Sequence, residues 1–330
     1  MILAGDIGGT KAHLAVFAPG DGTRAPSIEE RLPTAGSASL DALLRAFLER
    51  TGVRPARVVL GIAGPVSDNR CITTNLPWQV DGAALERALG APVTLINDLE
   101  ATGWGLAMLG PSDLRTLQAG ERAEGNRALI AAGTGLGESI LHWDGTTWIP
   151  MASEGGHSDF APRDTLEDEL LVWLRAKHGR VSYERVLSGP GLANLYRFMR
   201  ETGRGEEPSA VARAFDSASD PASVVSAAAL DGSCERAALA LERFVSIYGA
   251  EAGNLALKAL ALGGVFVGGG IAPRLLPALE GGGFTRAFLD KGRLSPVLSR
   301  VPIAVVLDSR TAVWGAAAYA RRSPLLEARP

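Results

Sequence analysis

The stretch Leu3-Ala4-Gly5-Asp6-Ile7-Gly8-Gly9-Thr10-Lys11 decides the fold of this chain. Its first residues are apolar and predict a short strand, and the glycines predict a tight loop. Residues 12–17 predict a second strand, followed by turn chemistry at residues 19–22. A dinucleotide-binding fingerprint has a helix after its glycines, whereas this loop leads into a strand. The stretch therefore predicts a hairpin around a phosphate-sized loop and argues against a nicotinamide-dependent dehydrogenase.

Strands and helices alternate beyond this hairpin. Apolar runs at residues 57–63 and 93–96 predict buried strands. Apolar residues at helical spacing over 40–48 predict a helix, with Ser39 as its N-cap. A helix from about Leu99 to Leu109 follows the second strand. Such alternation is typical of an α/β domain.

The same pattern starts again after a polar stretch at residues 111–126. A strand at 128–132 runs into the glycine loop at 133–137, and 138–142 predicts the returning strand. A strand, a glycine loop and a strand thus occur twice, which indicates an internal duplication of the fold. Residues 204–221 are polar and small, and they predict a surface linker. The later elements expected are helices at about 165–177, 190–201, 235–262 and 311–321, and strands at 265–267 and 303–307.

Composition sets limits on the function. The chain has 330 residues, and Lys plus Arg (33) nearly balances Asp plus Glu (36), giving a net charge of −3. This balance argues against a partner bound mainly by charge, such as nucleic acid or an anionic membrane. The length suggests two domains. No signal-peptide pattern opens the chain and no apolar run is long enough to cross a bilayer, so we expect a cytoplasmic protein.

The cysteines point to no special chemistry. Cys71 and Cys234 lie far apart and lack metal-ligand spacing. A disulfide scaffold and a cysteine-ligated zinc site are therefore not expected. We expect two reduced thiols.

Three glycine loops follow apolar strands, at residues 5–11, 133–137 and 268–270. Glycine allows the backbone N–H groups of a loop to approach phosphate oxygens closely. One such loop is weak evidence by itself, but three in this order match the nucleotide-binding core of sugar kinases, actin and heat-shock ATPases. Further motifs occur at residues 3–16, 75–78, 95–101, 132–137, 153–157 and 184–192.

Together these motifs resemble the bacterial glucokinases of the proteobacterial type, over residues 1 to about 320. The resemblance implies transfer of the γ-phosphate of ATP to the 6-hydroxyl of D-glucose with Mg²⁺, giving glucose 6-phosphate and ADP for glycolysis. It implies a two-domain α/β actin-like ATPase (ribonuclease H-like) fold with the active site in the interdomain cleft. The small domain would be residues 1–107, completed by a C-terminal helix at 309–330, and the large domain 108–308. It also implies a homodimer.

The resemblance assigns roles to residues of this chain. Asp98 would be the general base that accepts the proton of the sugar hydroxyl, although an aspartate at a helix start can also be an N-cap. Asp6 would meet the phosphates through Mg²⁺ and its waters rather than as a direct ligand. The expected sugar-binding residues are Asn97, Asp98, Glu154, His157 and Glu184. The expected nucleotide-binding residues are Gly5, Asp6, Ile7, Gly8, Gly9, Thr10, Gly133, Thr134, Gly135, Gly268, Gly269 and Gly270.

Two alternatives remain open from the sequence. The kinase could act on another sugar, such as mannose, an amino sugar or fructose. A non-catalytic sugar sensor or repressor could use the same fold, but such proteins usually carry an N-terminal DNA-binding domain, and here the loop begins at Gly5. Lys11 stands where many relatives have Asn. The related repressor–kinase family has a cysteine-rich zinc motif after its Glu-x-Gly-His, whereas His157 has no cysteine nearby, so no zinc is expected.

Overall fold

The contacts of the computed structural model divide the chain into two compact units. The structure describes residues 1–22, 24–73 and 76–322. Of these residues, the first unit comprises those within Met1–Asp113, Trp148–Ala152 and 308–322, and the second comprises Leu114–Thr147 and Ser153–Leu307. Asn75 of the expected motif and the end of the expected 309–330 segment lie outside the described residues.

The sheet of the first unit has the strand order β3-β2-β1-β4-β8. β1 pairs antiparallel with β2 and parallel with β4, and β4 is parallel to β8. The hairpin expected around residues 8–10 is therefore present. The strands are β1 (Ile2–Ile7), β2 (Lys11–Phe17), β3 (Ile28–Pro33), β4 (Arg57–Ile62) and β8 (Val93–Asn97).

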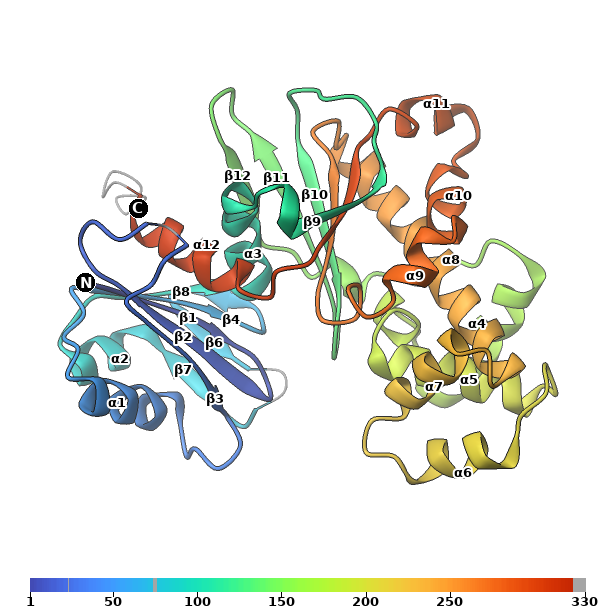
Figure 1. Cartoon of the computed structure of the whole chain (residues 1–330), viewed down its shortest axis with the longest axis horizontal. Coiled ribbons are helices and arrows are strands. Elements are labelled where there is room, and N and C mark those ends of the chain that lie inside the picture. Colours follow the sequence, from blue (N-terminus) through green and yellow to red (C-terminus); the bar gives the residue numbers. More distant parts are fainter. Residues whose placement is uncertain (23, 74–75, 323–330) are drawn as a thin grey trace. The chain divides into compact units, whose positions relative to one another are not determined.

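Helices cover both faces of this sheet (Figure 1). Alternate residues of a strand point to opposite faces. Leu3 accordingly packs in the core beneath α1 (Leu40–Thr51) and α2 (Gly82–Leu89). Its neighbour Ala4 packs in the core beneath α3 (Asp98–Gly105) and α12 (Thr311–Ala320).

Glycines let α3 and α12 cross closely. A Cβ atom on Gly105 would lie 2.0 Å from the carbonyl oxygen of Thr311, and one on Gly315 would lie 1.7 Å from that of Ala101. Neither position can hold a larger residue unless the helices move apart. The C-terminal helix is thus an integral part of the core beneath α3.

The remaining elements of the first unit are short. β5, β6 and β7 form a small antiparallel sheet. The bounds of all the short elements are β5 (Val66–Ser67), β6 (Arg70–Ile72), β7 (Gln79–Asp81), β12 (Trp148–Met151) and the 3₁₀ turns η1 (Leu106–Met108) and η2 (Pro111–Asp113).

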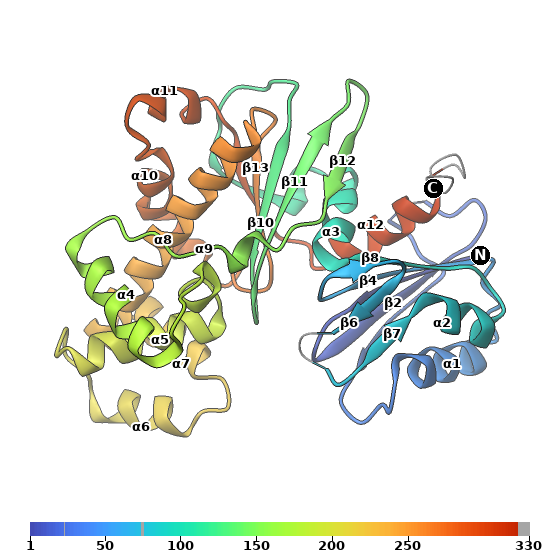
Figure 2. The same ribbon diagram turned by 180° about the vertical axis from the view of Figure 1, so that it is seen from behind.

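The second unit repeats the strand pattern of the first. Its strands β11, β10, β13, β14 and β9 are neighbours in that order, and β10, β11 and β13 can be followed in Figure 2. β10 pairs antiparallel with β11 and parallel with β13, and β13 is parallel to β14. The fold-level duplication is therefore present. The bounds are β9 (Leu114–Gln118), β10 (Arg127–Ala132), β11 (Leu136–Trp143), β13 (Val265–Gly268) and β14 (Ile303–Val306).

A long helix, α8 (Glu235–Ala259), carries much of the core of the second unit. Its buried Tyr248 accepts a hydrogen bond from the backbone N–H of Ala132 at 3.1 Å and so fixes the end of β10.

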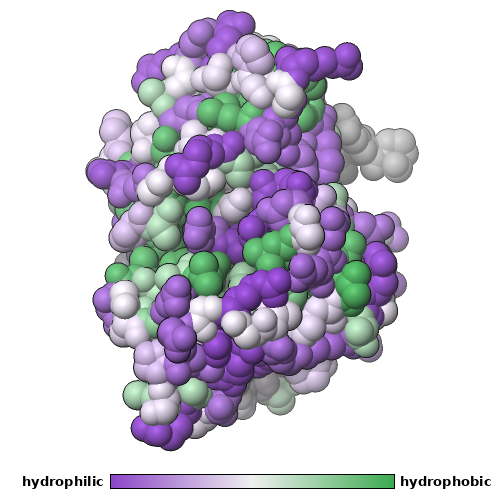
Figure 3. Space-filling view, turned by 90° about the vertical axis from the view of Figure 1, so that its right-hand side faces the viewer, coloured by the Kyte–Doolittle hydropathy of each residue, from purple (hydrophilic) through white to green (hydrophobic). Residues whose placement is uncertain are grey.

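The surface differs from this core, because hydrophilic side chains predominate on the face shown in Figure 3. The other helices are α4 (Thr165–His178), α5 (Gly189–Glu201), α6 (Ser209–Ser217), α7 (Pro221–Leu230), α9 (Leu276–Glu280), α10 (Gly283–Leu289) and α11 (Ser295–Leu298), with 3₁₀ turns η3 (Gly155–His157), η4 (Tyr183–Arg185) and η5 (Gly292–Leu294).

One expectation needs correction, because the segment 204–221, expected as a surface linker, contains helix α6. The polar stretch at 111–126 includes strand β9. The expected domain boundary at 107/108 differs from the observed division after Asp113, a residue that pairs with Arg24 of the first unit at 2.8 Å. Trp148–Ala152 also groups with the first unit.

Among the described residues, no helix combines the length and the apolar character needed to cross a membrane.

Candidate active site

The loop between β1 and β2 consists of Gly8, Gly9 and Thr10, and its shape is fixed by backbone contacts. Gly8 donates its N–H to the carbonyl of Lys11 at 3.0 Å. The hydroxyl of Thr34 donates to the carbonyl of Gly9 at 2.9 Å, and the N–H of Thr34 donates to that of Thr10 at 3.1 Å. These bonds occupy carbonyl oxygens of the loop, which is an arrangement suited to a loop that receives an anion.

Gly5 and Ile7 do not belong to this loop. Both are residues of β1, where Gly5 pairs with Leu14. A Cβ atom on Gly5 would lie 2.7 Å from Cδ2 of Leu60, so glycine is needed there for core packing. Ile7 is 1% exposed. Of the nucleotide-binding residues expected in this stretch, residues 8–10 therefore form the loop itself, and Asp6 lies beside them.

Asp6 lies near the end of β1, one residue before its last position. Burial raises the pKa of Asp6 to about 6, and the charge of Arg31 acts against this rise. A buried carboxylate of this kind is stabilised by a nearby cation. The position therefore fits a role in holding a metal ion next to bound phosphates.

Asn97 caps helix α3. Its Oδ1 accepts hydrogen bonds from the N–H groups of Leu99 at 2.9 Å and Glu100 at 3.3 Å, and its Nδ2 donates to the carbonyl of Gly64 at 3.2 Å. Asp98 is instead the first residue of the helix, and its Oδ1 accepts from the N–H of Leu99 at 2.9 Å. The interpretation of Asp98 as the N-cap is therefore wrong.

The phosphate loop and Asp98 share one edge of one sheet. β1, β4 and β8 are parallel, and their registers align Asp6 with Gly61 and Ile62 with Asn97. The carboxyl ends of parallel strands meet at the edge where α/β proteins place their ligands. A Cβ on Gly61 would lie 2.9 Å from Cβ of Ala101, so glycine there lets α3 approach the sheet.

The corresponding loop of the second unit, Gly133 to Gly135, is held by Glu184. Gly133 donates its N–H to the carbonyl of Gly135 at 2.8 Å. Oε2 of Glu184 accepts the N–H of Leu136 at 3.0 Å. A Cβ on Gly135 would lie 2.5 Å from the same Oε2. Glu184 lies in the turn η4 rather than on a regular helix, and its carboxylate is packed against the loop.

Three of the expected sugar-binding residues lie together in the second unit. Nε2 of His157 is 3.9 Å from Oε2 of Glu154, and its Nδ1 is 4.0 Å from Oε1 of Glu184. Their side chains are partly or largely exposed. The cluster thus presents two carboxylates and an imidazole, groups that can bind several hydroxyls of a neutral sugar.

The glycines of this segment have a steric reason. A Cβ on Gly156 would lie 2.0 Å from the carbonyl oxygen of Leu136, and one on Gly155 would lie 2.3 Å from Oε2 of Glu138. The backbone of η3 therefore rests directly on β11. Arg180 donates to the carbonyl of His157 at 2.6 Å and fixes the other end of the turn.

The glycines at 268–270 differ from one another. Gly269 has a φ of +82°, and a Cβ there would lie 2.3 Å from the carbonyl oxygen of Ala132. Gly268 ends β13, and a Cβ on Gly270 would meet no atom within 4 Å. Within this trio only Gly269 requires glycine, because of its backbone conformation and its close approach to Ala132. Gly270 has open space beside it, and the expected contact with adenosine would lie there.

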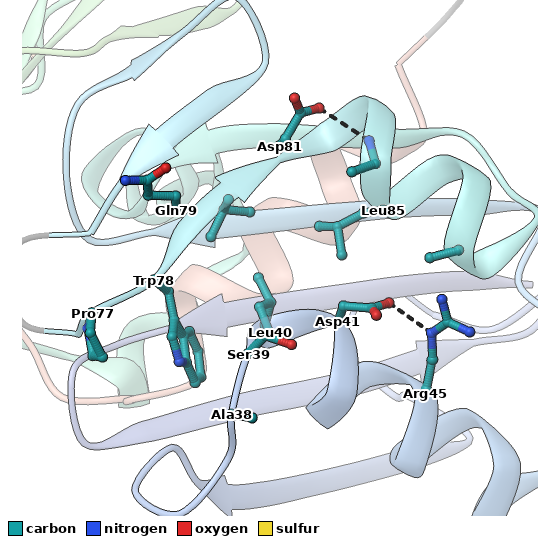
Figure 4. A pocket seen from close by; sticks show the side chains of 13 residues that line it. Ala38, Ser39, Leu40, Asp41, Arg45, Pro77, Trp78, Gln79, Asp81 and Leu85 are labelled. Carbon is teal, nitrogen blue, oxygen red and sulfur yellow. Dashed lines mark hydrogen bonds and ion pairs between the residues drawn. The ribbon is translucent and has the colours of Figure 1, made fainter.

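A cavity of about 330 Å³ lies in the first unit between the beginning of α1 and α2 (Figure 4). Trp78 and Leu85 line it, and Asp41 and Arg45 are paired at its rim. None of the expected phosphate- or sugar-binding residues lines this cavity. Trp78 is therefore a buried aromatic residue at the wall of a separate cavity.

His13 and the two cysteines occupy buried positions. His13 is 6% exposed and lies 2.7 Å from Glu29, and burial lowers its pKa. Cys71 and Cys234 are buried free thiols. Within the described residues, no group of three or more His, Cys, Asp or Glu side chains has the arrangement of a metal centre.

Sequence reasoning missed one pair of acidic residues. Glu138 and Glu251 are 1% and 0% exposed, far apart in the sequence, and both belong to the second unit. Glu251 follows Tyr248 by three residues and precedes Leu255 by four, so its position on the apolar face of α8 was available from helical spacing.

Comparison with known proteins gives full-length matches. A family model described as Glucokinase matches residues 3–323. The glucokinase of Nostoc sp. (strain PCC 7120) is 39% identical, covering 98% of this chain and 99% of the relative. The glucokinase of Synechocystis sp. (strain PCC 6803) is 40% identical, covering 97% of this chain and 98% of the relative.

Solved structures also match this chain in three dimensions. The glucokinase from an Antarctic psychrotroph superimposes with a TM-score of 0.82 at 32% identity, covering 98% of this chain and 99% of that one. A ROK family glucokinase from Streptomyces griseus, in complex with glucose and AMPPNP, has a TM-score of 0.67 at 21% identity, covering 98% and 99%. The second likeness concerns the fold alone.

Proposed function

The chain belongs to the glucokinase family, and from this premise we propose that it transfers the γ-phosphate of ATP to the 6-hydroxyl of D-glucose. The products are glucose 6-phosphate and ADP, the first for glycolysis. One observation carries the proposal beyond family membership. The anion-type loop at residues 8–10 and Asp98 lie at the same edge of one sheet, where the strands β1, β4 and β8 are parallel.

Asp98 is the proposed general base. The 6-oxygen of glucose forms a bond to the γ-phosphorus while the bond from that phosphorus to the bridging oxygen breaks, and ADP leaves. The hydroxyl proton passes to the Asp98 carboxylate. Such proton transfer typically contributes 10²–10⁴-fold in rate. Asn97 supports this step because its cap fixes the first turn of α3, which carries Asp98.

Glu154, His157 and Glu184 are the proposed sugar-binding residues of the second unit, with Asn97 and Asp98 from the first. Gly133, Thr134 and Gly135 would hold phosphate oxygens together with residues 8–10, and Gly268 to Gly270 would border the adenosine. The proposed fold is the ribonuclease H-like arrangement in which residues of both units contact one glucose. Compaction on glucose binding, measured by small-angle scattering, tests this part.

Mg²⁺ is the proposed metal, and Asp6 is the residue that would hold it through water. A single carboxylate with phosphate oxygens and waters is an ordinary Mg²⁺ environment. The raised pKa of Asp6 supports this assignment, because a buried carboxylate that is poorly compensated by the protein is suited to a nearby cation. When bound, Mg²⁺ neutralises charge on the transferring phosphoryl group.

A homodimer in the cytoplasm completes the proposal, and sedimentation of the purified chain tests the oligomeric state. The activity test is ADP release with ATP and Mg²⁺ over a panel of glucose, mannose, glucosamine and fructose. We expect glucose to give the highest kcat/KM. A higher kcat/KM with another sugar of the panel would show that this sugar, and not glucose, is the preferred substrate. Glucose binding without ADP release would favour a sugar sensor.

A further inference from the structure

A buried pair of acids lies behind the proposed sugar-binding turn. Glu138 on β11 and Glu251 on α8 are 1% and 0% exposed. Glu138 directly supports the turn, because a Cβ on Gly155 would lie 2.3 Å from its Oε2 and 3.1 Å from its Cδ. Gly155 directly follows the proposed ligand Glu154 and lies two residues before the proposed ligand His157. The state of this carboxyl group therefore bears on the position of both ligands.

Glu251 has a polar partner at each carboxylate oxygen, whereas one carboxylate oxygen of Glu138 has none among the described residues. Oε2 of Glu251 accepts a hydrogen bond from Nδ2 of Asn254 at 2.8 Å, and its Oε1 is 3.4 Å from Nζ of Lys258. Oε1 of Glu138, by contrast, is buried and has no hydrogen-bond partner among the described residues. Burial and the charge of Glu251 raise the pKa of Glu138 to about 8, while Lys258 acts against the rise.

The other polar groups of the cluster come from neighbouring elements. Tyr183 of η4 accepts a hydrogen bond from Asn254 at 3.2 Å, and Lys291 donates to the Oδ1 of Asn254 at 2.7 Å. Tyr248 of α8 is close enough for the charge of Glu138 to raise its pKa, although burial is the larger cause. The titratable groups that face Glu138 or its partner are thus Glu251, Lys258, Tyr183, Tyr248 and Lys291, with Glu154 and His157 on the turn above.

We propose that Glu138 is a positioning residue for the sugar-binding turn, acting as a neutral carboxylic acid that shares its proton with Glu251. An ionised carboxylate cannot donate, so a hydrogen bond between the two acids requires one proton. The neutral acid fills the space beneath Gly155 without repelling its partner. The inference rests on the proposed role of Glu154 and His157 in binding glucose.

Loss of this proton to solvent places two negative charges side by side in a buried site. The repulsion acts on β11 and on the turn above it. Gly156 leaves the turn little room to adjust, since its Cα is packed on the carbonyl of Leu136. Ionisation of Glu138 is therefore expected to weaken glucose binding in alkaline solution while ATP binding is unaffected.

The test compares wild type with Glu138→Gln from pH 6.5 to 9.5, measuring kcat and the KM values for glucose and ATP. Glutamine has the same shape, does not ionise and can donate to Glu251. In wild type we expect KM for glucose to rise several-fold above about pH 8, with little change in KM for ATP. In Glu138→Gln we expect KM for glucose to remain near the low-pH wild-type value throughout.

The matched control is Glu201→Gln, which makes the same substitution at an exposed residue that pairs with Lys177 at 2.8 Å. It should follow the wild-type pH profile. If Glu138→Gln keeps the wild-type rise in KM, another group causes the rise and the proposal is wrong. A parallel rise in KM for ATP in wild type would also overturn it.

A second variant and a second readout keep the test independent of folding and of activity. Glu251→Gln removes the facing charge, so ionisation of Glu138 no longer places two negative charges side by side, and the alkaline rise in KM for glucose should disappear. A rise equal to that of wild type counts against the proposal. Hydrogen exchange of the amides at 153–158, corrected for intrinsic rates, should increase above pH 8 in wild type and not in Glu138→Gln. Equal exchange in both proteins overturns the positioning role. Absence of ADP release at every pH would overturn the proposed function alone.

Discussion

The hairpins β1–β2 and β10–β11 have the same topology but keep their acids in different places. In the first unit Asp6 lies on the strand that enters the loop, and in the second Glu138 lies on the strand that leaves it. Burial raises the pKa of both, to about 6 and about 8. The first acid can meet a ligand at the loop, whereas the second is sealed beneath the turn η3.

The difference shows how one fold element can serve two purposes. In the first unit the polar groups at the sheet edge are the proposed phosphate ligands and the proposed proton acceptor. In the second unit Glu184 holds the loop, and Glu138 supports the neighbouring turn. Substitutions in the first unit should therefore change the chemical step, and those in the second should change sugar affinity.

The largest effect is expected from Asp98→Asn. The proton acceptor is lost, so kcat should fall at least ~10²-fold. The cap of α3 belongs to Asn97, so the melting temperature should hardly change. Glucose should still bind within about tenfold. An ADP-release assay and calorimetric titration of glucose on one sample measure these quantities, and near-normal turnover would remove Asp98 from the mechanism.

Glu154→Gln tests the second unit in the same way. The amide keeps the shape of the side chain but replaces a charged acceptor, which costs about 1–3 kcal/mol for a hydrogen bond to a charged group. KM for glucose should rise accordingly, with little change in kcat or in KM for ATP. Steady-state kinetics with each substrate varied in turn measure both KM values. A parallel rise in the two values would contradict the proposed division of roles between the units.

Asp6 predicts a pH dependence of stability in the absence of Mg²⁺ and nucleotide. Because the folded-state pKa (about 6) exceeds the ordinary value of 3.8, the folded protein binds more protons between these values. Stability therefore falls as pH rises through this window, by about 1 kcal/mol between pH 5 and 7.5. Urea unfolding at the two pH values should reveal this difference between wild type and Asp6→Asn. An identical pH dependence in both proteins would show that Asp6 does not titrate in this range.

The smallest effect is expected inside the loop of the second unit. A Cβ on Gly135 would lie 2.5 Å from Oε2 of Glu184, whereas one on Gly133 would meet nothing within 4 Å. Gly135→Ala should displace the end of a flexible side chain and raise KM for glucose a few-fold. Gly133→Ala is the matched control and should leave that KM unchanged. Equal KM values for the two variants would mean that Glu184 does not transmit the change.

Contiguous motifs and periodicity were enough to predict the hairpins, their loops and half of the α-helices that the described residues form. The identity of the cap could not be read from Asn97-Asp98, because both side chains cap helices well and only the backbone direction distinguishes them. Strand β9 was missed because Leu114–Gln118 alternates weakly and is polar, and α6 because Phe215 is its only buried residue among those described.

The clustering of distant residues was the part that sequence could not supply. Glu154, His157 and Glu184 were expected to share a ligand, but their mutual distances follow from the packing of η3 and η4. The contact between β11 and α8 that brings Glu138 to Glu251 joins residues 113 positions apart, and no local pattern specifies it. Burial, rather than residue type, gives that pair its chemistry.

The C-terminal helix that crosses α3 has a consequence for synthesis of the protein. The strands β1, β2 and β4 and the helix α3 leave the ribosome early. The core between this sheet and α3 lacks α12 until that helix has also been made. At typical elongation speeds the intervening second unit takes roughly 10–40 s to make. During that interval the face of the sheet that includes Ala4 and Val59 has no helix α12 to cover it. The first unit therefore cannot complete this core until α12 has been made, and the second unit can finish folding before the first.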